Sequence, residues 1–276
     1  IDVTKIESEI TDKTKAILAM HYSGVMCNTP AIREIADKHK LLFIEDAAQA
    51  YCGEYQGHKV GSLSDAAIYS MNTMKLLPSY GEAGVLVTNN KALCEKVKMY
   101  RYTGTTSDPK KIITNDCHYV SLNHKIHTIQ AAMLIVSLEE LPARIERRKA
   151  ITMKYNDALS GLVKTPEMKE SDHYALYAYT IAADDRDALQ TYLNAAGIET
   201  KIYHLPLTVD TPVYKNVRKT DVTNARRLAG RCLSLPCHEK LSDEQVEFVI
   251  SKVQAFYQET PLKANSSDEL QHVGEK

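Results

Sequence analysis

Short apolar runs of strand length recur near the start of this chain, and this pattern limits the folds open to it. Thr14–Met20 and Leu41–Ile44 are separated by a segment with helical spacing, and Ala66–Met71 and Gly84–Thr88 follow. A strand–helix–strand order predicts an α/β fold with a parallel or mixed sheet. The unbroken apolar character of Leu41–Ile44 further predicts a strand that is buried on both faces.

The helices expected beside these strands are marked by their end signals. Thr29 followed by Pro30 is typical of an N-cap and a first helical residue, so a helix is predicted from Pro30 to His39. Asn90–Tyr102 is a second predicted helix. Both helices would follow a strand, as in the connections of a parallel sheet.

The second half of the chain is predicted to hold a long helix and further strands and helices. Apolar residues at helical spacing from Ile126 onward predict the long helix, which Pro142 is expected to kink or to divide into two. Tyr174–Ala182 is expected to form a strand and Asp187–Ala196 a helix. Ser242 and the residues after it form a capping-box sequence, which predicts a last helix.

Polar side chains that follow the predicted strands are the candidate functional groups, because ligands of α/β sheets bind beyond the carboxyl ends of strands. His21 follows the first strand, Asp46 and Gln49 the second, and Lys75 the third, with Ser70 just before it. A lysine in an apolar stretch loses its proton more easily and can act as a nucleophile. Lysine with a strand-end carboxylate is what pyridoxal phosphate requires, although each residue alone is also compatible with a surface charge or a helix cap.

Composition and missing motifs exclude several other classes of function. Lys and Arg number 34 against 35 Asp and Glu, so the net charge of −1 gives no electrostatic reason to expect nucleic acid or an anionic membrane as partner. The 11 glycines never form G-x-G, and neither a P-loop nor a nucleophile elbow is present. The 6 cysteines form no C-x-x-C pair, which indicates reduced thiols of a cytoplasmic protein without a metal site.

One alternative is a metal protein, because Cys117, His118, His124 and His127 lie close together in the sequence.

The order of the motifs is more specific than any of them alone. HYSG, IEDAAQA, IYSMNTMK, LNHKIHTIQAAM and SLPCHEKLSDEQVEFVI follow one another between residue 21 and residue 250. In this order they resemble the DegT/StrS-type sugar aminotransferases, which are pyridoxal phosphate enzymes of the aspartate-aminotransferase-like fold class. The resemblance covers the chain from Ile1 to about Tyr257. It implies a large domain with a mixed, mainly parallel sheet and a smaller α+β C-terminal domain.

The resemblance implies a role for each matching residue. Lys75 matches the lysine that binds the cofactor covalently and then moves the substrate proton. Asp46 matches the carboxylate that pairs with the ring nitrogen, Gln49 the glutamine beside the ring hydroxyl, and Ser70 the hydroxyl that binds the phosphate. Asn123 matches an asparagine that reaches the phosphate site of the neighbouring subunit, which implies a homodimer with shared active sites.

The implied domain organisation places residues 1–140 in the large cofactor-binding domain and residues 141–258 in the long helix and the small domain. Residues 259–276 are polar and lack periodicity, so a disordered tail is expected. Ile1 falls in the middle of the family pattern, and the N-terminal portion of that pattern, with a phosphate-binding loop and part of the large domain, is not in the sequence.

The function implied by the resemblance is transfer of an amino group from glutamate to a keto sugar, expected to be linked to a nucleotide, in amino sugar biosynthesis. Related dehydratases carry histidine in place of the lysine, so Lys75 favours amino transfer. The alternative is a non-catalytic or split relative of the same fold that acts as a scaffold or a regulatory subunit.

Overall fold

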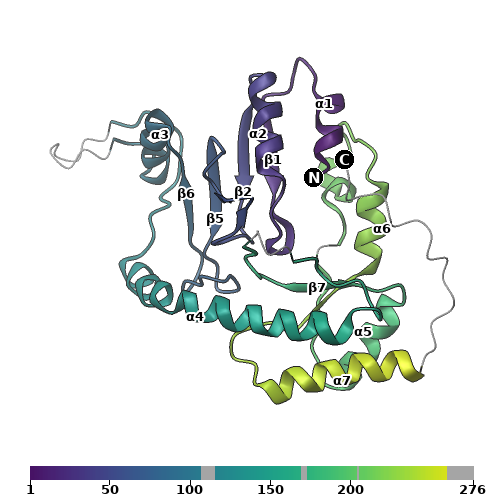
Figure 1. The fold of residues 1–276 in the computed structure, drawn as a ribbon. Coiled ribbons are helices and arrows are strands. Elements are labelled where there is room, and N and C mark those ends of the chain that lie inside the picture. Colours follow the sequence, from purple (N-terminus) through teal and green to yellow (C-terminus); the bar gives the residue numbers. More distant parts are fainter. Residues whose placement is uncertain (107–115, 169–172, 204, 260–276) are drawn as a thin grey trace. The chain divides into compact units, whose positions relative to one another are not determined.

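The computed structural model describes most of the chain as two compact units (Figure 1). The described residues are 1–106, 116–168, 173–203 and 205–259. The first unit is formed by Ile1–Lys149 and Glu167–Ala178, and the second by Ala150–Pro166 and the chain from Tyr179 onward. The predicted disordered tail lies outside the described residues except for residue 259.

A four-stranded sheet with the order β1-β2-β5-β6 forms the centre of the first unit. The strands are β1 (Ala16–Met20), β2 (Leu42–Asp46), β5 (Ala66–Ser70) and β6 (Gly84–Val87). The first three are parallel, and β6 runs antiparallel to β5. Met20 is paired with Asp46, and Asp46 with Ile68, so the parallel strands end at one common edge. The predicted α/β class with a mixed, mainly parallel sheet is confirmed.

Helix α2 (Thr29–Lys38) connects β1 to β2 and packs on one face of the sheet. The buried cluster between them consists of Ile6, Ile17, Ala19, Ile32, Ala36, Leu41 and Phe43. Asn28, rather than the predicted Thr29, caps the helix, because its side chain accepts a hydrogen bond from the N–H of Ala31 at 3.2 Å. Thr29 is itself buried as the first helical residue.

The opposite face of this sheet exposes apolar side chains. Leu18, Leu42 and Ile68 are 60%, 53% and 44% exposed, whereas Phe43 is fully buried. The prediction that Leu41–Ile44 is buried on both faces is therefore wrong. Successive side chains of a strand point to opposite faces, and within the described residues helix α2 and its cluster cover only the face to which Phe43 points.

The other elements of the first unit are short, apart from two helices. They are η1 (Val3–Lys5), α1 (Ile6–Glu9), η2 (Tyr22–Gly24), β3 (Glu54–Tyr55), β4 (His58–Lys59), α3 (Lys91–Arg101) and the start of α4 (Thr128–Leu159). Pro142 lies inside the single helix α4, so the alternative in which it begins a second helix is wrong. Leu141 beside it is buried, and Pro142 leaves one helical carbonyl without its usual backbone donor.

The second unit contains the two-stranded antiparallel sheet of β7 (Tyr179–Ala182) and β8 (Cys232–Leu235). Its other elements are the end of α4, α5 (Arg186–Ala195), η3 (Thr208–Asp210), η4 (Pro212–Tyr214), α6 (Thr223–Arg231) and α7 (Asp243–Glu259). Its core includes Tyr155, Tyr179, Leu189, Leu233 and Val246. The strand predicted from Tyr174 begins only at Tyr179, because the residues before it belong to the first unit.

The predicted capping box at the start of α7 is confirmed. Ser242 Oγ accepts from the N–H of Gln245 at 3.2 Å, and Gln245 Oε1 accepts from the N–H of Ser242 at 3.0 Å. We predict that Ser242→Ala lowers the free energy of unfolding by about 1 kcal/mol, because a helical N–H loses its partner. Urea denaturation followed by circular dichroism measures the loss. Ser251→Ala on the same helix is the control, and an equal loss there would contradict the prediction.

Candidate functional site

Asp46 and Lys75 both lie at the edge of the sheet where the parallel strands end. Asp46 is the last residue of β2, and its carboxylate accepts from the N–H of Ala48 at 3.0 Å. Lys75 lies in the turn after β5, where its N–H donates to the carbonyl of Asn72 at 2.9 Å. Partial burial lowers the pKa of the Lys75 amine, and the negative charge of Asp46 counteracts part of that effect. The amine therefore lies within electrostatic reach of Asp46 and loses its proton more easily than an exposed lysine.

Ser70 and Gln49 lie next to these two residues in the chain. Ser70 is the last residue of β5, and its Oγ accepts from the N–H of Asn72, 3.4 Å away, at the start of the turn that carries Lys75. Gln49 is buried in the loop after β2, where its Oε1 accepts from the N–H of Ser23 at 2.6 Å. The structure thus brings Asp46, Ser70 and Lys75 to one edge and places Gln49 in the adjoining loop.

Asn123, the fifth site residue predicted from the sequence, does not lie at this edge of the sheet. It is exposed and forms an isolated antiparallel bridge with Tyr102, next to the end of α3. In the parts of the chain that the structure describes, neither a hydrogen bond nor an ion pair joins Asn123 to Asp46 or Lys75. Asn123 is therefore separate, within one chain, from the three residues at the sheet edge and from Gln49.

Tyr177 contacts Lys75 although 101 residues separate the two in the sequence. The Nζ atom of Lys75 lies over the Tyr177 ring, 4.6 Å from its centroid, which is within the range of a cation–π contact. Sequence reasoning missed this residue, because it assigned the segment to a regular strand. No motif in the segment marks it as part of a site; its position depends on long-range contacts of the backbone.

His173–Ala178, here called the return segment, carries Tyr177 and is held to the earlier part of the first unit by hydrogen bonds at both ends. His173 exchanges two backbone hydrogen bonds with Glu54, at 2.8 and 3.0 Å. At the other end, Ser23 Oγ donates to the carbonyl of Ala178 at 3.1 Å. Ser23 is also the residue whose N–H is bound by Gln49, so the predicted site loop and the return segment share one partner.

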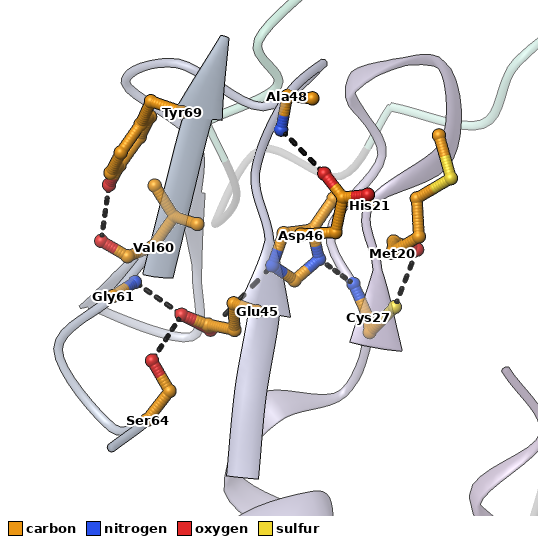
Figure 2. A network of polar contacts seen from close by, with 10 residues as sticks. All are labelled: Met20, His21, Cys27, Glu45, Asp46, Ala48, Val60, Gly61, Ser64 and Tyr69. Carbon is orange, nitrogen blue, oxygen red and sulfur yellow. Dashed lines mark hydrogen bonds and ion pairs between the residues drawn. The ribbon is translucent and has the colours of Figure 1, made fainter. Parts of the chain in front are cut away.

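A buried polar network lies next to Asp46 at the end of β2 (Figure 2). His21 and Glu45 are 0% and 1% exposed, and His21 Nε2 is 3.6 Å from Glu45 Oε1. Glu45 Oε2 accepts from the N–H of Gly61 and from the hydroxyl of Ser64, the latter at 3.0 Å. The network therefore connects the end of β1, the end of β2 and the loop after β4.

The hydrogen bonds of His21 indicate which of its nitrogens carries a proton. The backbone N–H of Cys27 donates to Nδ1 at 3.1 Å, so Nδ1 is the acceptor and the proton of the neutral ring lies on Nε2, facing Glu45. The backbone N–H of His21 also donates to the carbonyl of Asp46 at 3.1 Å. His21, which the sequence placed at a strand end, thus contacts both residues of the Glu45-Asp46 pair.

Among the described residues, which include Cys117, His118, His124 and His127, no group of three or more His, Cys, Asp or Glu side chains is arranged to hold a metal ion. None of the described helices is both long enough and apolar enough to cross a membrane.

Comparison with known proteins gives a match over nearly the whole chain. Residues 1–254 match the DegT/DnrJ/EryC1/StrS aminotransferase family. The chain is 36% identical over 264 residues to a pleiotropic regulatory protein of Geobacillus stearothermophilus, a match that covers 93% of this chain and 69% of that protein. It is 31% identical over 258 residues to the dTDP-3-amino-3,4,6-trideoxy-alpha-D-glucose transaminase of Streptomyces venezuelae, covering 92% and 66% of the two chains.

Solved structures show the same fold. The crystal structure of DesV from S. venezuelae in complex with a ketimine intermediate matches with a TM-score of 0.85 and 30% identity, over 93% of this chain and 68% of that chain. A DegT DnrJ EryC1 StrS aminotransferase from Brucella abortus matches with a TM-score of 0.82 and 29% identity, over 92% and 67%. The expected aminotransferase fold is therefore confirmed.

The buried network predicts a stability cost for a minimal change at Glu45. Glu45→Gln removes the negative charge that lies 3.6 Å from His21 Nε2. An amide NH₂ in place of Oε2 would also leave the N–H of Gly61 and the hydroxyl of Ser64 without their acceptor. We expect the free energy of unfolding to fall by about 1–3 kcal/mol. The control is Glu54→Gln, a carboxylate that is 24% exposed and 3.9 Å from His173 Nδ1, for which a change of at most about 0.5 kcal/mol is expected. Equal losses in urea denaturation would contradict the role of the network.

Proposed function

The chain belongs to the DegT/DnrJ/EryC1/StrS aminotransferase family, and from this premise we propose that it transfers an amino group from glutamate to a keto sugar with pyridoxal 5'-phosphate as cofactor. The observation that carries the proposal is the placement of Asp46, the last residue of β2, and Lys75, in the turn after β5, at one edge of the sheet, where the charge of Asp46 acts on the Lys75 amine. The Streptomyces venezuelae relative is named a transaminase of a dTDP-linked sugar, which supports a nucleotide-linked keto sugar as the acceptor.

The side chains at the sheet edge fit the chemical groups of this cofactor. Lys75 offers an amine for the aldehyde, and Asp46 a carboxylate for the protonated ring nitrogen. Ser70 offers a hydroxyl for the phosphate and Gln49 an amide for the ring hydroxyl. When bound, pyridoxal phosphate supplies an electron sink for the carbon next to the transferred nitrogen. Asn123 would serve the phosphate site of a second copy of the chain.

The proton transfers of the reaction are assigned to Lys75. Its amine, once free, takes a proton from the substrate carbon and gives it back at a neighbouring atom, first with glutamate and then in the reverse sense with the keto sugar. A lowered pKa serves this role, because the amine must exist without its proton near neutral pH. Asp46 counteracts part of the lowering of the Lys75 pKa, so that the charged form of Lys75 stays accessible as well.

A homodimer is part of the proposal and is supported by the surface around Asn123. Val120 and Leu122 beside it are 101% and 70% exposed, and exposed apolar side chains of this kind suit burial against a second copy. We also propose a cytoplasmic location, which fits the 6 free cysteines.

A scaffold or regulatory role is the second candidate, and one observation favours it. The Geobacillus stearothermophilus relative at 36% identity is named a pleiotropic regulatory protein. The retained amine and carboxylate at the sheet edge argue for chemistry instead. Covalent labelling of Lys75 separates the two, because a scaffold has no need of a cofactor on that residue.

The first prediction of this proposal concerns covalent attachment. Pyridoxal phosphate added to the full chain and fixed with borohydride should leave a pyridoxyl group on Lys75, identified by peptide mass mapping. Lys75→Ala should lose that label and all amino transfer, whereas Lys59→Ala, at an exposed strand residue, should keep both. Because burial lowers the pKa of Lys75, labelling should already be substantial at pH values where exposed lysines react slowly. Labelling spread evenly over surface lysines would refute the assignment.

The second prediction separates attachment from chemistry. Asp46→Asn keeps the size of the side chain but removes the charge that holds the ring nitrogen protonated, so the Lys75 label should persist while amino transfer falls by roughly 100-fold or more. Asp12→Asn, at an exposed turn, is the matched control and should transfer amino groups at the unchanged rate. Full activity of Asp46→Asn would show that another group pairs with the ring.

A further inference from the structure

We propose that Tyr177 is a positioning residue for Lys75. The Tyr177 ring holds the amine of Lys75 at the sheet edge and stabilises the charged form of that amine. The basis is the cation–π contact of 4.6 Å between Lys75 Nζ and the Tyr177 ring centroid. The inference deepens the proposed function, since it concerns the residue to which that function assigns the proton transfers. The contact itself lies wholly within the first unit.

The position of the ring is built by the backbone of the return segment. Leu176 has a φ of +51°, a left-handed conformation that a branched side chain rarely adopts, so the chain turns just before Tyr177. Arg148 holds this turn, because its guanidinium donates to the carbonyls of Leu176 at 3.3 Å and Tyr177 at 3.2 Å. An unfavourable local conformation that is stabilised from outside indicates a position set by the surrounding structure.

A glycine in the facing loop permits this close approach. The N–H of Ala175 donates to the carbonyl of Gly24 at 3.1 Å. A Cβ atom on Gly24 would lie 3.0 Å from the backbone nitrogen of Leu176 and 3.1 Å from the Cβ of Ala175, and Gly24 has a φ of +88°. A side chain at this position would push the return segment away and carry Tyr177 with it.

The charge around Lys75 explains what the ring contributes. Partial burial removes water from the amine and disfavours its charged form, and the charge of Asp46 restores part of that loss. The face of an aromatic ring is electronegative and favours the charged form in the same way. A lysine that takes and returns a proton has to be stable in both forms, and Asp46 and Tyr177 together support the form that burial disfavours.

The test follows the amine itself rather than turnover. The full chain, freed of pyridoxal phosphate with hydroxylamine, is labelled with trace acetic anhydride between pH 6 and 11, and acetylation of Lys75 is quantified by mass spectrometry. Tyr177→Met keeps an apolar, flexible cover without a ring, and Tyr177→Phe keeps the ring without the hydroxyl. The midpoint of the pH profile reports the amine's proton, and the plateau at high pH reports its accessibility.

We expect Tyr177→Met to move the midpoint to lower pH, so that Lys75 labelling at pH 7.5, corrected by the plateau, rises about two- to five-fold. Tyr177→Phe should have the same acetylation profile as the wild-type chain, because it keeps the ring. Phe248→Leu removes the cation–π partner of Lys252, 5.5 Å from the ring in α7, and should leave Lys75 unchanged. An unchanged or higher midpoint in Tyr177→Met, or a Tyr177→Phe profile equal to that of Tyr177→Met, would overturn the proposal.

The outcomes also keep this proposal apart from the proposed function. If borohydride leaves no pyridoxyl group on Lys75 of the unmodified chain, the assigned cofactor chemistry fails, while the acetylation profiles still decide the role of Tyr177. If the pyridoxyl label forms on Lys75 but the acetylation midpoint is the same in Tyr177→Met and in the wild-type chain, the role of Tyr177 is wrong and the proposed function stands.

Discussion

The contact between His21 and Glu45 is the interaction on which the sheet edge with Asp46 depends. Two polar side chains are taken out of water at the ends of adjacent strands, which is costly unless their hydrogen bonds are met. The N–H of Cys27 donates to His21 Nδ1, and the N–H of Gly61 and the hydroxyl of Ser64 donate to Glu45 Oε2 (Figure 2). Within the described residues, His21 Nε2 is buried without a hydrogen bond, 3.6 Å from Glu45 Oε1, so the charge of Glu45 is what it faces. The donors of these hydrogen bonds come from two loops, the one between β1 and α2 and the one after β4, so the buried pair constrains both loops.

The arrangement matters for Asp46 because of the alternation of side chains along a strand. Glu45 points into the network, so Asp46, the next residue, points to the other side. Its carbonyl accepts from the N–H of His21, and the N–H of the following Ala47 donates to the carbonyl of Ile68 at 2.9 Å. The backbone at Asp46 is thus fixed by both neighbouring strands, and a one-residue shift would exchange the roles of the two carboxyl groups.

Features that depend on nearby residues could be predicted from the sequence, and features that depend on distant ones could not. The strands of the first sheet and the capping box at Ser242 are encoded within a few residues, and so is the placement of Asp46 and Lys75 after two of these strands. The cap of α2 differed by one position, because Asn28 and Thr29 offer equivalent acceptors and only the backbone decides between them. The turn at Leu176 was missed, because its apolar surroundings are typical of a strand and its stabilisation comes from Arg148.

The return segment also has a consequence for how the chain folds as it is synthesised. The first unit is discontinuous in sequence, because residues 150–166 of the second unit come between its two parts. Proteins emerge from the ribosome N-terminus first. The loops at Gly24 and Glu54 therefore cannot form their hydrogen bonds with the return segment until residue 178 has been added. By then the residues of the first helical turns of the second unit have already been synthesised. The order of synthesis makes completion of the first unit a late event, and the aromatic ring over Lys75 is among the last parts to be put in place.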